Sequence, residues 1–461
     1  MPTTCVPLTP LEESLIVDDR ASYPWNILYR LQFGGRLDRT KFEEALASTL
    51  ARHWHLRSRV RRRWTQRFVR ELAAESPRPR IHWNEHELGR WPRVHKLDAA
   101  AGETLEFWVR AGEAHSELLV HVHHVAVDGL GAVQFLGDLL TAYHGAEASS
   151  GPVAVKDASP TESPRGAELP RGVEGNSSGN GLRKTGKQIL DGVQWVRQFL
   201  TRRPVPLVPH EAASLDQPLS ANYPTLNAHT FTATETAALL ASARQLSVSL
   251  NDLLLRDLFA TLFIWRRERG HAEAEQWLRI LVPMDVRTAA DRDRPAANRM
   301  SGVFLDRREI DGQDAAALLR SLHDEMTAIK PNKSQRVFLL TLRVSSFVPG
   351  LIGWVARRAK VVHTAILSNL VRPFAELPLP RDQGRLIVAG LPLDSLEFFP
   401  PIRPHTCLAY GIATYAGRLT IGLHADSRFL APNDCVELLS RYIAQLSASQ
   451  KESDGNRPTK E

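Results

Sequence analysis

The chain has 461 residues, of which 43% are hydrophobic and 24% charged, a composition typical of soluble globular proteins with two or three domains. The net charge of +7, from 58 Lys and Arg against 51 Asp and Glu, favours anionic partners such as a phosphorylated cofactor, an acidic carrier or an anionic membrane surface. No aromatic-basic motif accompanies this charge, which argues against binding of nucleic acid.

The cysteines and the apolar runs of the sequence indicate the cellular compartment. Cys5, Cys407 and Cys435 show no CxxC spacing, so they predict neither a disulfide framework nor a zinc site. The N-terminal MPTTCVPLTPLEE lacks a basic region followed by an apolar core, and no uncharged apolar run is long enough to span a membrane. We therefore expect a cytoplasmic protein.

The first half mixes predicted strands and helices. Asp38 is a predicted N-cap, and the two strands that flank the short loop GEAHS form a predicted hairpin. Strands are predicted at 26–32, 105–111 and 117–124, and helices at 41–53 and 132–143.

The composition then shifts to Ser, Gly, Pro and charged residues. Such a sequence buries too little apolar surface to order itself, so residues 147–182 are predicted to lack regular structure and to be easily cut by protease. A short helix is predicted at 187–200, before the Pro-rich RRPVPLVP.

The second half again alternates helices and strands, and Thr234 is a predicted N-cap. Residues 344–356, flanked by Arg343, Arg357 and Arg358, favour a buried helix pair broken at Pro349-Gly350; the alternative is an interfacial segment that touches lipid. Helices are predicted at 234–246, 252–268, 313–328, 334–358 and 431–448, and strands at 277–285, 301–309, 363–370, 384–391, 406–415 and 417–426.

These elements predict two α/β (or α+β) halves with a cleft between them. The predicted units are an N-terminal subdomain at 1–146, a flexible crossover at 147–222, a C-terminal subdomain at 223–448 and a disordered tail at 449–461.

Three histidines end the strand at 117–124, in the sequence HVHHVAVDGLG. Because side chains alternate along a strand, His124 ends the apolar stripe of Leu118, Val120 and Val122, just before Asp128-Gly129 turns the chain. Three interpretations are open: core histidines with satisfied hydrogen bonds, a metal site, or a general base that deprotonates a hydroxyl or amine. The spacing misses the HxHxDH pattern of metallohydrolases, so no metal site is predicted.

His123, His124, Asp128 and Gly129 fit HHxxxDG, which resembles the signature of the chloramphenicol-acetyltransferase-like superfamily. That group includes condensation domains and the wax ester synthase/diacylglycerol acyltransferases. Weaker likenesses follow in the same order along residues 6–448: RHWHLRSRV at 52–60, LNDLLL at 250–255, ILVPMDVR at 280–287, NRMS at 298–301, SNL at 368–370 and HADSRFL at 424–430.

The resemblance implies a fold of two subdomains in a V with a central tunnel, and a role for each motif residue. His124 would be the base, Asp128 would pair with Arg57 to hold the loop, and Gly129 would keep the channel open. His123 belongs to the same motif. Ser368 or Asn369 could donate to the oxyanion, although an ordinary strand end is equally consistent with SNL.

We expect a free-standing acyltransferase without a tightly bound cofactor, which takes acyl-CoA or an acyl carrier protein as donor and an alcohol or lipid-like hydroxyl as acceptor. No GxSxG motif or reactive cysteine context predicts a covalent intermediate. The alternatives are an amide-forming condensation-type enzyme and an inactive binding or scaffold protein. Peripheral membrane contact is a further possibility. The acyl chain, the acceptor and the oligomeric state are not predicted.

Overall fold

The protein is described by a computed structural model that covers residues 4–63, 67–72, 78–85, 92–145, 197–199, 201–209, 219, 223–291, 293–332, 335–348, 350–358 and 361–452. Most of the crossover predicted at 147–222 therefore lies outside the described residues. Of the short helix predicted at 187–200, residues 197–199 are described and are helical.

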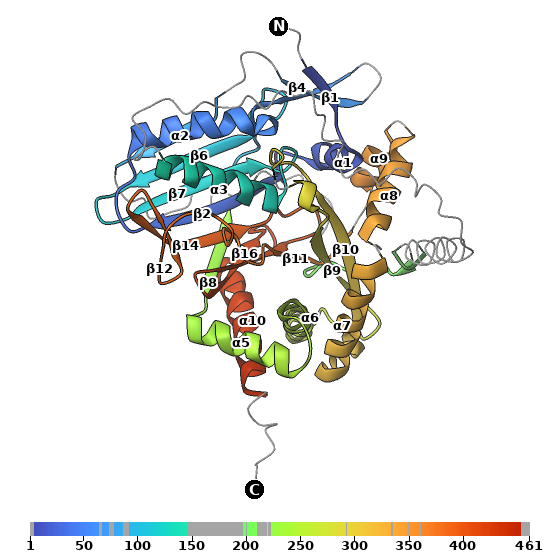
Figure 1. Cartoon of the computed structure of the whole chain (residues 1–461). Helices are drawn as coiled ribbons and strands as arrows, with labels where there is room; N and C mark the ends of the chain where they lie inside the picture. The colour runs from blue at the N-terminus through green and yellow to red at the C-terminus, as the bar shows by residue number, and fades with distance from the viewer. Residues whose placement is uncertain are drawn as a thin grey trace, which may run out of the picture.

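The first subdomain is a seven-stranded sheet with α2 and α3 on one face (Figure 1). Its strand order is β12-β13-β14-β2-β7-β6-β5, and β6 and β7 form the predicted hairpin. The elements are α1 (Pro10–Asp18), β2 (Asn26–Phe33), α2 (Arg39–Arg52), β5 (Arg80–Asn84), β6 (Leu105–Ala111), β7 (Ser116–His123) and α3 (Gly129–Gly145). A small separate sheet joins β1 (Thr4–Pro7), β4 (Phe68–Leu72) and β3 (Arg59–Arg62) in that order.

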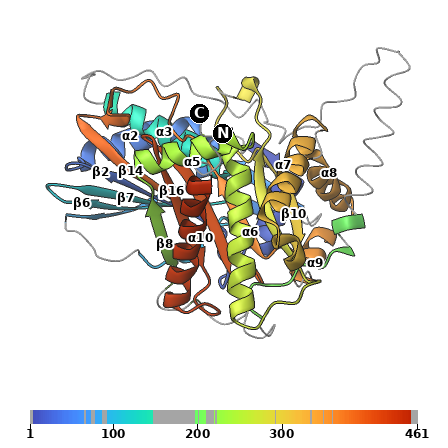
Figure 2. The same ribbon diagram turned by 90° about the horizontal axis from the view of Figure 1, so that it is seen from below.

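The second subdomain is a six-stranded sheet flanked by α5, α6, α7 and α10 (Figure 2). Its order is β10-β9-β11-β15-β16-β8, with β11 parallel to both neighbours. The strands are β8 (Thr225–Thr230), β9 (Trp277–Asp285), β10 (Met300–Arg308), β11 (Ala365–Asn369), β15 (Leu408–Tyr415) and β16 (Arg418–Ala425). The helices are α5 (Ala233–Gln245), α6 (Leu250–Glu268), α7 (Ala315–Asn332), α8 (Gln335–Ser346), α9 (Leu351–Arg358) and α10 (Pro432–Glu452).

The predicted boundary between the two halves needs a correction. Residues 381–399 were assigned to the C-terminal subdomain, but they form β12 (Arg381–Asp382), β13 (Arg385–Val388) and β14 (Leu391–Phe399) in the first sheet. The physical reason is that β14 pairs with β2 from Leu393↔Phe33 to Phe399↔Leu28 and satisfies the backbone groups of that edge. The first sheet is therefore completed by three strands that the chain supplies from within its second half, which interlocks the two subdomains.

Helix ends also differ from the prediction at two places. Thr232, not Thr234, is the N-cap of α5, since its side chain accepts a hydrogen bond from the backbone of Glu235, whose carboxylate binds back in a capping box. Helix α10 continues to Glu452, so the disordered tail predicted at 449–461 is wrong for residues 449–452, and the rest of it lies outside the described residues. The predicted N-cap Asp38 is confirmed, because its carboxylate accepts from Lys41 N at 2.9 Å.

Candidate active site

His124 is the first residue of the turn that links β7 to α3. Its backbone N–H donates to Trp25 O at 2.8 Å, and the Trp25 ring meets the imidazole edge-on with 5.7 Å between ring centroids. Nδ1 of His124 is buried without a hydrogen-bond partner, while the residue as a whole keeps 7% exposure. His124 is therefore an almost fully buried histidine with one unpaired ring nitrogen.

The surroundings of His124 favour the neutral imidazole. Burial lowers the pKa of His124 below its ordinary value of 6.5, and the nearby His123 lowers it further, while its own carbonyl, Asp128 and Asn298 raise it in part. A neutral imidazole can accept a proton at neutral pH, which is the requirement for a general base.

His123 is fully buried and is held by hydrogen bonds on both ring nitrogens. Nδ1 accepts from Val125 N at 3.1 Å, and Nε2 lies 3.4 Å from a carboxylate oxygen of Asp19. Burial raises the pKa of Asp19, but hydrogen bonds with His123 and Lys96 outweigh that effect, so the pKa is lowered overall. His123 therefore stabilises the turn, with Nε2–H as donor to Asp19.

Asp128 holds the other end of the turn with both carboxylate oxygens. Oδ1 accepts from Gly131 N and from Arg287 Nη2, both at 2.7 Å, and Oδ2 accepts from Arg299 N at 2.6 Å. Burial raises the pKa of Asp128, but the Arg287 guanidinium and the backbone donors outweigh it, so the pKa is lowered overall. The carboxylate is therefore ionised and ties the turn to residues 285–299 of the second subdomain.

The predicted pairing of Asp128 with Arg57 is wrong. The guanidinium at Asp128 belongs to Arg287, whereas Nε of Arg57 is buried without a hydrogen-bond partner. The reason is that Arg287 N and Nη1 also bind Asp285 at 3.0 Å, and Arg287 Nη2 binds Ala297 O at 2.9 Å, which aims the guanidinium at Asp128. Arg287 ends the segment ILVPMDVR, but no spacing in the sequence links it to HHxxxDG.

Asn298 is a second residue that the sequence did not assign. Its amide Nδ2 donates to His124 O at 3.0 Å and to Val125 O at 2.9 Å. Arg70 donates to Val125 O at 2.7 Å and to Glu12 Oε1 at 2.9 Å, so a buried ion pair supports the same turn. A cavity of about 20 Å³ lies beside Asn298, Arg70 and Glu12, which is room for one water molecule.

Two glycines allow the close contacts around the motif. A Cβ at Gly129 would lie 3.1 Å from a methyl of Leu370, and the Gly129 carbonyl accepts from Tyr29 Oη at 2.8 Å. A Cβ at Gly131 would lie 2.8 Å from Ala297 O and 3.2 Å from Arg287 Nη2. Gly131 therefore makes room for the segment that binds Asp128.

Ser368 and Asn369 end β11, directly before Leu370, which lies against Gly129. Asn369 Nδ2 lies 3.4 Å from Asn251 Oδ1, and its own Oδ1 accepts from Val371 N at 2.8 Å. The structure thus joins the SNL and LNDLLL segments beside the motif. The role of Ser368 and Asn369 at an oxyanion stays a prediction.

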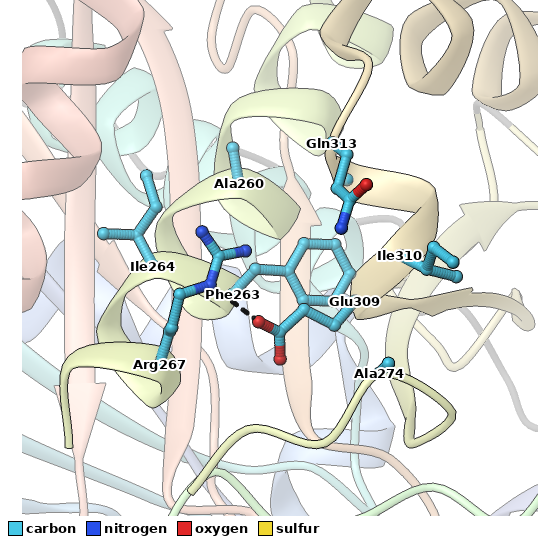
Figure 3. Close-up of a pocket in the computed structure, with 9 residues that line it drawn as sticks. Ala260, Phe263, Ile264, Arg267, Ala274, Glu309, Ile310 and Gln313 are labelled. Atoms are coloured by element: carbon cyan, nitrogen blue, oxygen red, sulfur yellow. Dashed lines mark hydrogen bonds and ion pairs between the residues drawn. The ribbon is translucent and has the colours of Figure 1, made fainter. Parts of the chain in front are cut away.

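Within the described ranges, no group of three or more His, Cys, Asp or Glu side chains is arranged to hold a metal ion. A second cavity, of about 510 Å³, lies between α6 and the segment 309–313, where Arg267 binds Glu309 at 2.8 Å (Figure 3). Neither cavity is lined by His124, and the central tunnel implied by the resemblance stays an expectation.

Solved structures with the same two-subdomain fold define the class. The chain superposes on the starter condensation domain of rhizomide synthetase, crystallised with C8-CoA, with a TM-score of 0.65 over 98% of this chain and 96% of that one at 14% identity. Polyketide synthase associated protein 5 of Mycobacterium tuberculosis gives 0.61 over 98% and 100% at 16% identity. Trichothecene 15-O-acetyltransferase of Fusarium sporotrichioides gives 0.67 over 97% and 96% at 12% identity. The chain has the chloramphenicol-acetyltransferase-like fold.

A protein-family model matches the C-terminal third of the chain. Residues 297–447 match the model of the WS/DGAT C-terminal domain. Uncharacterized proteins from two strains of Mycobacterium tuberculosis are 28% identical over 159 residues, which is 31% of this chain and 34% of theirs. The match thus spans about a third of the length of these curated relatives. The family match agrees with the resemblance carried by HHxxxDG.

Proposed function

We propose that the protein is an acyltransferase that moves an acyl group from a thioester donor to a hydroxyl acceptor, with His124 as general base. The observation that carries the proposal is the geometry of His124: a neutral imidazole, with a buried Nδ1 that has no hydrogen-bond partner, on a turn fixed by His123, Asp128 and Asn298. The WS/DGAT match and the acyltransferases among the structural neighbours support the reaction class.

In the proposed step, Nε2 of His124 takes the proton of the acceptor hydroxyl while its oxygen attacks the thioester carbonyl. The carbon–sulfur bond of the tetrahedral intermediate then breaks, and the imidazolium returns its proton to the thiolate. The products are an ester and a free thiol. Positioning, a base and a donor to the oxyanion are sufficient for such a direct transfer.

The cysteines support transfer without an acyl-enzyme. Burial raises the pKa of the Cys407 thiol to about 12, and burial likewise raises the pKa of Cys435 to about 12. Thiols with such pKa values are protonated at neutral pH and are poor nucleophiles. The remaining cysteine, Cys5, is exposed in β1 and its thiol lies 3.9 Å from Glu71.

The donor is proposed to be acyl-CoA or an acyl-phosphopantetheine arm. Two of the structural neighbours, starter condensation domains of rhizomide synthetase, were solved with C8-CoA. Thiol release from a panel of acyl-CoAs, with alcohols and amines as separate acceptors, tests the donor and the bond formed. We expect thiol release that depends on an alcohol. Release only with amines would favour the amide-forming alternative. No release with either acceptor would favour the binding or scaffold alternative.

A further inference from the structure

Large apolar side chains gather on the outer side of α8, α9 and the turn between them. Of the nine large apolar side chains that are exposed in the described part of the chain, five lie within residues 340–354. Phe347 is 68% exposed and Trp354 52%. We call these five the α8–α9 face: Leu340, Val344, Phe347, Val348 and Trp354.

The two helices are anchored on their other side, so the exposure is a stable property of the fold. The Phe338 ring, on α8, meets Phe304 of β10 with 5.8 Å between ring centroids. Helix α1 packs against both α8 and α9, at the edge of the molecule shown in Figure 1. Leu340 and Val344 are four residues apart and share one side of α8, as in an amphipathic helix.

The charge of this segment has one sign. Residues 330–360 contain seven basic residues and no Asp or Glu. The net charge of this segment, +7, therefore equals that of the whole chain. The rest of the chain is therefore balanced, because the remaining 51 basic residues equal the 51 acidic residues in number. The seven are Lys330, Lys333, Arg336, Arg343, Arg357, Arg358 and Lys360.

We propose that the α8–α9 face docks on a bilayer of anionic phospholipid. Exposed Phe and Trp side chains enter the interface between headgroups and acyl chains, while the basic residues of this segment of the sequence attract the anionic headgroups. No helix within the described residues is long and apolar enough to cross a membrane, and this mode of binding requires none.

The docked face is connected to the candidate active site through α1. Glu12 of α1 binds Arg70, and both Arg70 and Asn298 bind the carbonyls of the turn that begins at His124. Docking would therefore bring the active-site turn close to the bilayer, where an apolar acyl chain or alcohol is concentrated. This last step rests on the proposed acyltransferase function, whereas the docking itself does not.

The experiment measures sedimentation of the full chain with phosphatidylcholine vesicles, with and without one-third phosphatidylglycerol. We expect binding to the anionic vesicles that weakens as salt screens the charges. The double variant Phe347→Ser/Trp354→Ser should bind at least about tenfold more weakly, because two exposed aromatic groups no longer enter the interface. Arg343→Glu should weaken binding at low salt more than at high salt.

The matched control is Leu246→Ser/Val436→Ser, which removes two exposed apolar side chains from the end of α5 and from α10, helices that lie away from α8 and α9 (Figure 1). It should bind like the wild type. The proposal is overturned if the wild type ignores anionic vesicles at low salt, or if the control loses as much binding as the Phe347/Trp354 variant. It is also overturned if the wild type forms a dimer that the variant loses while vesicles have no effect.

Transfer to a soluble alcohol from a short-chain acyl-CoA, without vesicles, separates docking from chemistry. The Phe347→Ser/Trp354→Ser variant should keep this activity. If the wild type is active but does not bind vesicles, the docking proposal is contradicted and the proposed function stands. If the wild type binds vesicles but is inactive, the proposed function is contradicted and the docking proposal stands.

Discussion

At the scale of single residues, Asp128 and Arg287 form a buried pair that joins the turn of the candidate active site to the second subdomain. Asp128 is nearly inaccessible, and Arg287 is mostly covered. Removing one partner leaves the other charge without compensation, which costs about 3–5 kcal/mol for a buried pair. We expect Arg287→Ala and Asp128→Ala to lose similar stability and the double variant to lose less than their sum.

Urea unfolding measures this coupling, with Arg57→Ala as the matched arginine control. Arg57→Ala should be additive with Asp128→Ala, and coupling to Arg57 instead of Arg287 would contradict the pairing. Because the folded pKa of Asp128 is lowered, its stabilisation is present above the ordinary carboxyl pKa of 3.8 and is lost as pH falls through the folded value. The gap between the wild type and Arg287→Ala should therefore narrow in acid.

Asn298 is predicted to position His124 and to favour its protonated form. Asn298→Ala leaves the carbonyls of His124 and Val125 without this donor and removes an interaction that raises the pKa of His124. The turnover number should fall with little change in KM, and the acid limb of the pH–rate profile should move to lower pH.

Gln134→Ala is the control for Asn298→Ala, since Gln134 also donates its amide to the segment 285–299, at Arg294 O, without contacting the turn. Its acid limb should match that of the wild type. An acid limb that does not move in Asn298→Ala would leave Asn298 with a purely structural role.

At the scale of elements, β14 lies so close to the second sheet that only glycine fits beneath it. Gly411 of β15 and Gly422 of β16 are paired across the strands, and a Cβ on them would lie 2.1 Å and 2.6 Å from Phe398 O. Overpacking of a buried site costs about 1–3 kcal/mol, and here the obstacle is backbone that cannot turn aside. Gly411→Ala should therefore destabilise the protein by at least that much.

Thermal or urea unfolding tests this, with Gly145→Ala at the end of α3 as the control, because a Cβ there meets nothing within 4 Å. Gly145→Ala should leave stability almost unchanged. Equal stability of Gly411→Ala and the wild type would contradict the contact between β14 and the second sheet.

Sequence periodicity located the elements whose pattern is local. The strands predicted at 105–111 and 277–285 coincide with β6 and β9, and the predicted break of 334–358 at Pro349-Gly350 separates α8 from α9. Strand β14 was missed, because LPLDSLEFF contains a proline, does not alternate and pairs with a strand more than 350 residues away. Arg287 was missed for a similar reason: its proximity to Asp128 results from packing between subdomains.

At the scale of the whole molecule, the insertion of β12–β14 into the first sheet makes the two subdomains interdependent. Without residues 381–399, β2 would be an unpaired edge and the core would lose Leu393, Leu396 and Phe398. Cleavage within 147–182, which lies outside the described residues, should therefore leave two fragments that elute together in size-exclusion chromatography.

The control for this experiment is residues 1–222 expressed alone, which should be insoluble or lack cooperative unfolding. A soluble, cooperatively folded 1–222 fragment, or clipped fragments that separate without denaturant, would contradict the interlocked architecture. Resistance of 147–182 to protease would contradict the prediction that this segment lacks regular structure.

The central claim is that His124 acts as the base in acyl transfer, and the pH dependence of thiol release measures it most directly. Since the base must be neutral and its pKa is lowered, the wild-type rate should rise through an apparent pKa below 6.5 and stay level through neutral pH. His124→Ala should fold normally, release thiol roughly 10²–10⁴-fold more slowly and lose the acid limb. A His124→Ala variant that keeps most of the activity, or that keeps the same acid limb, would contradict the claim.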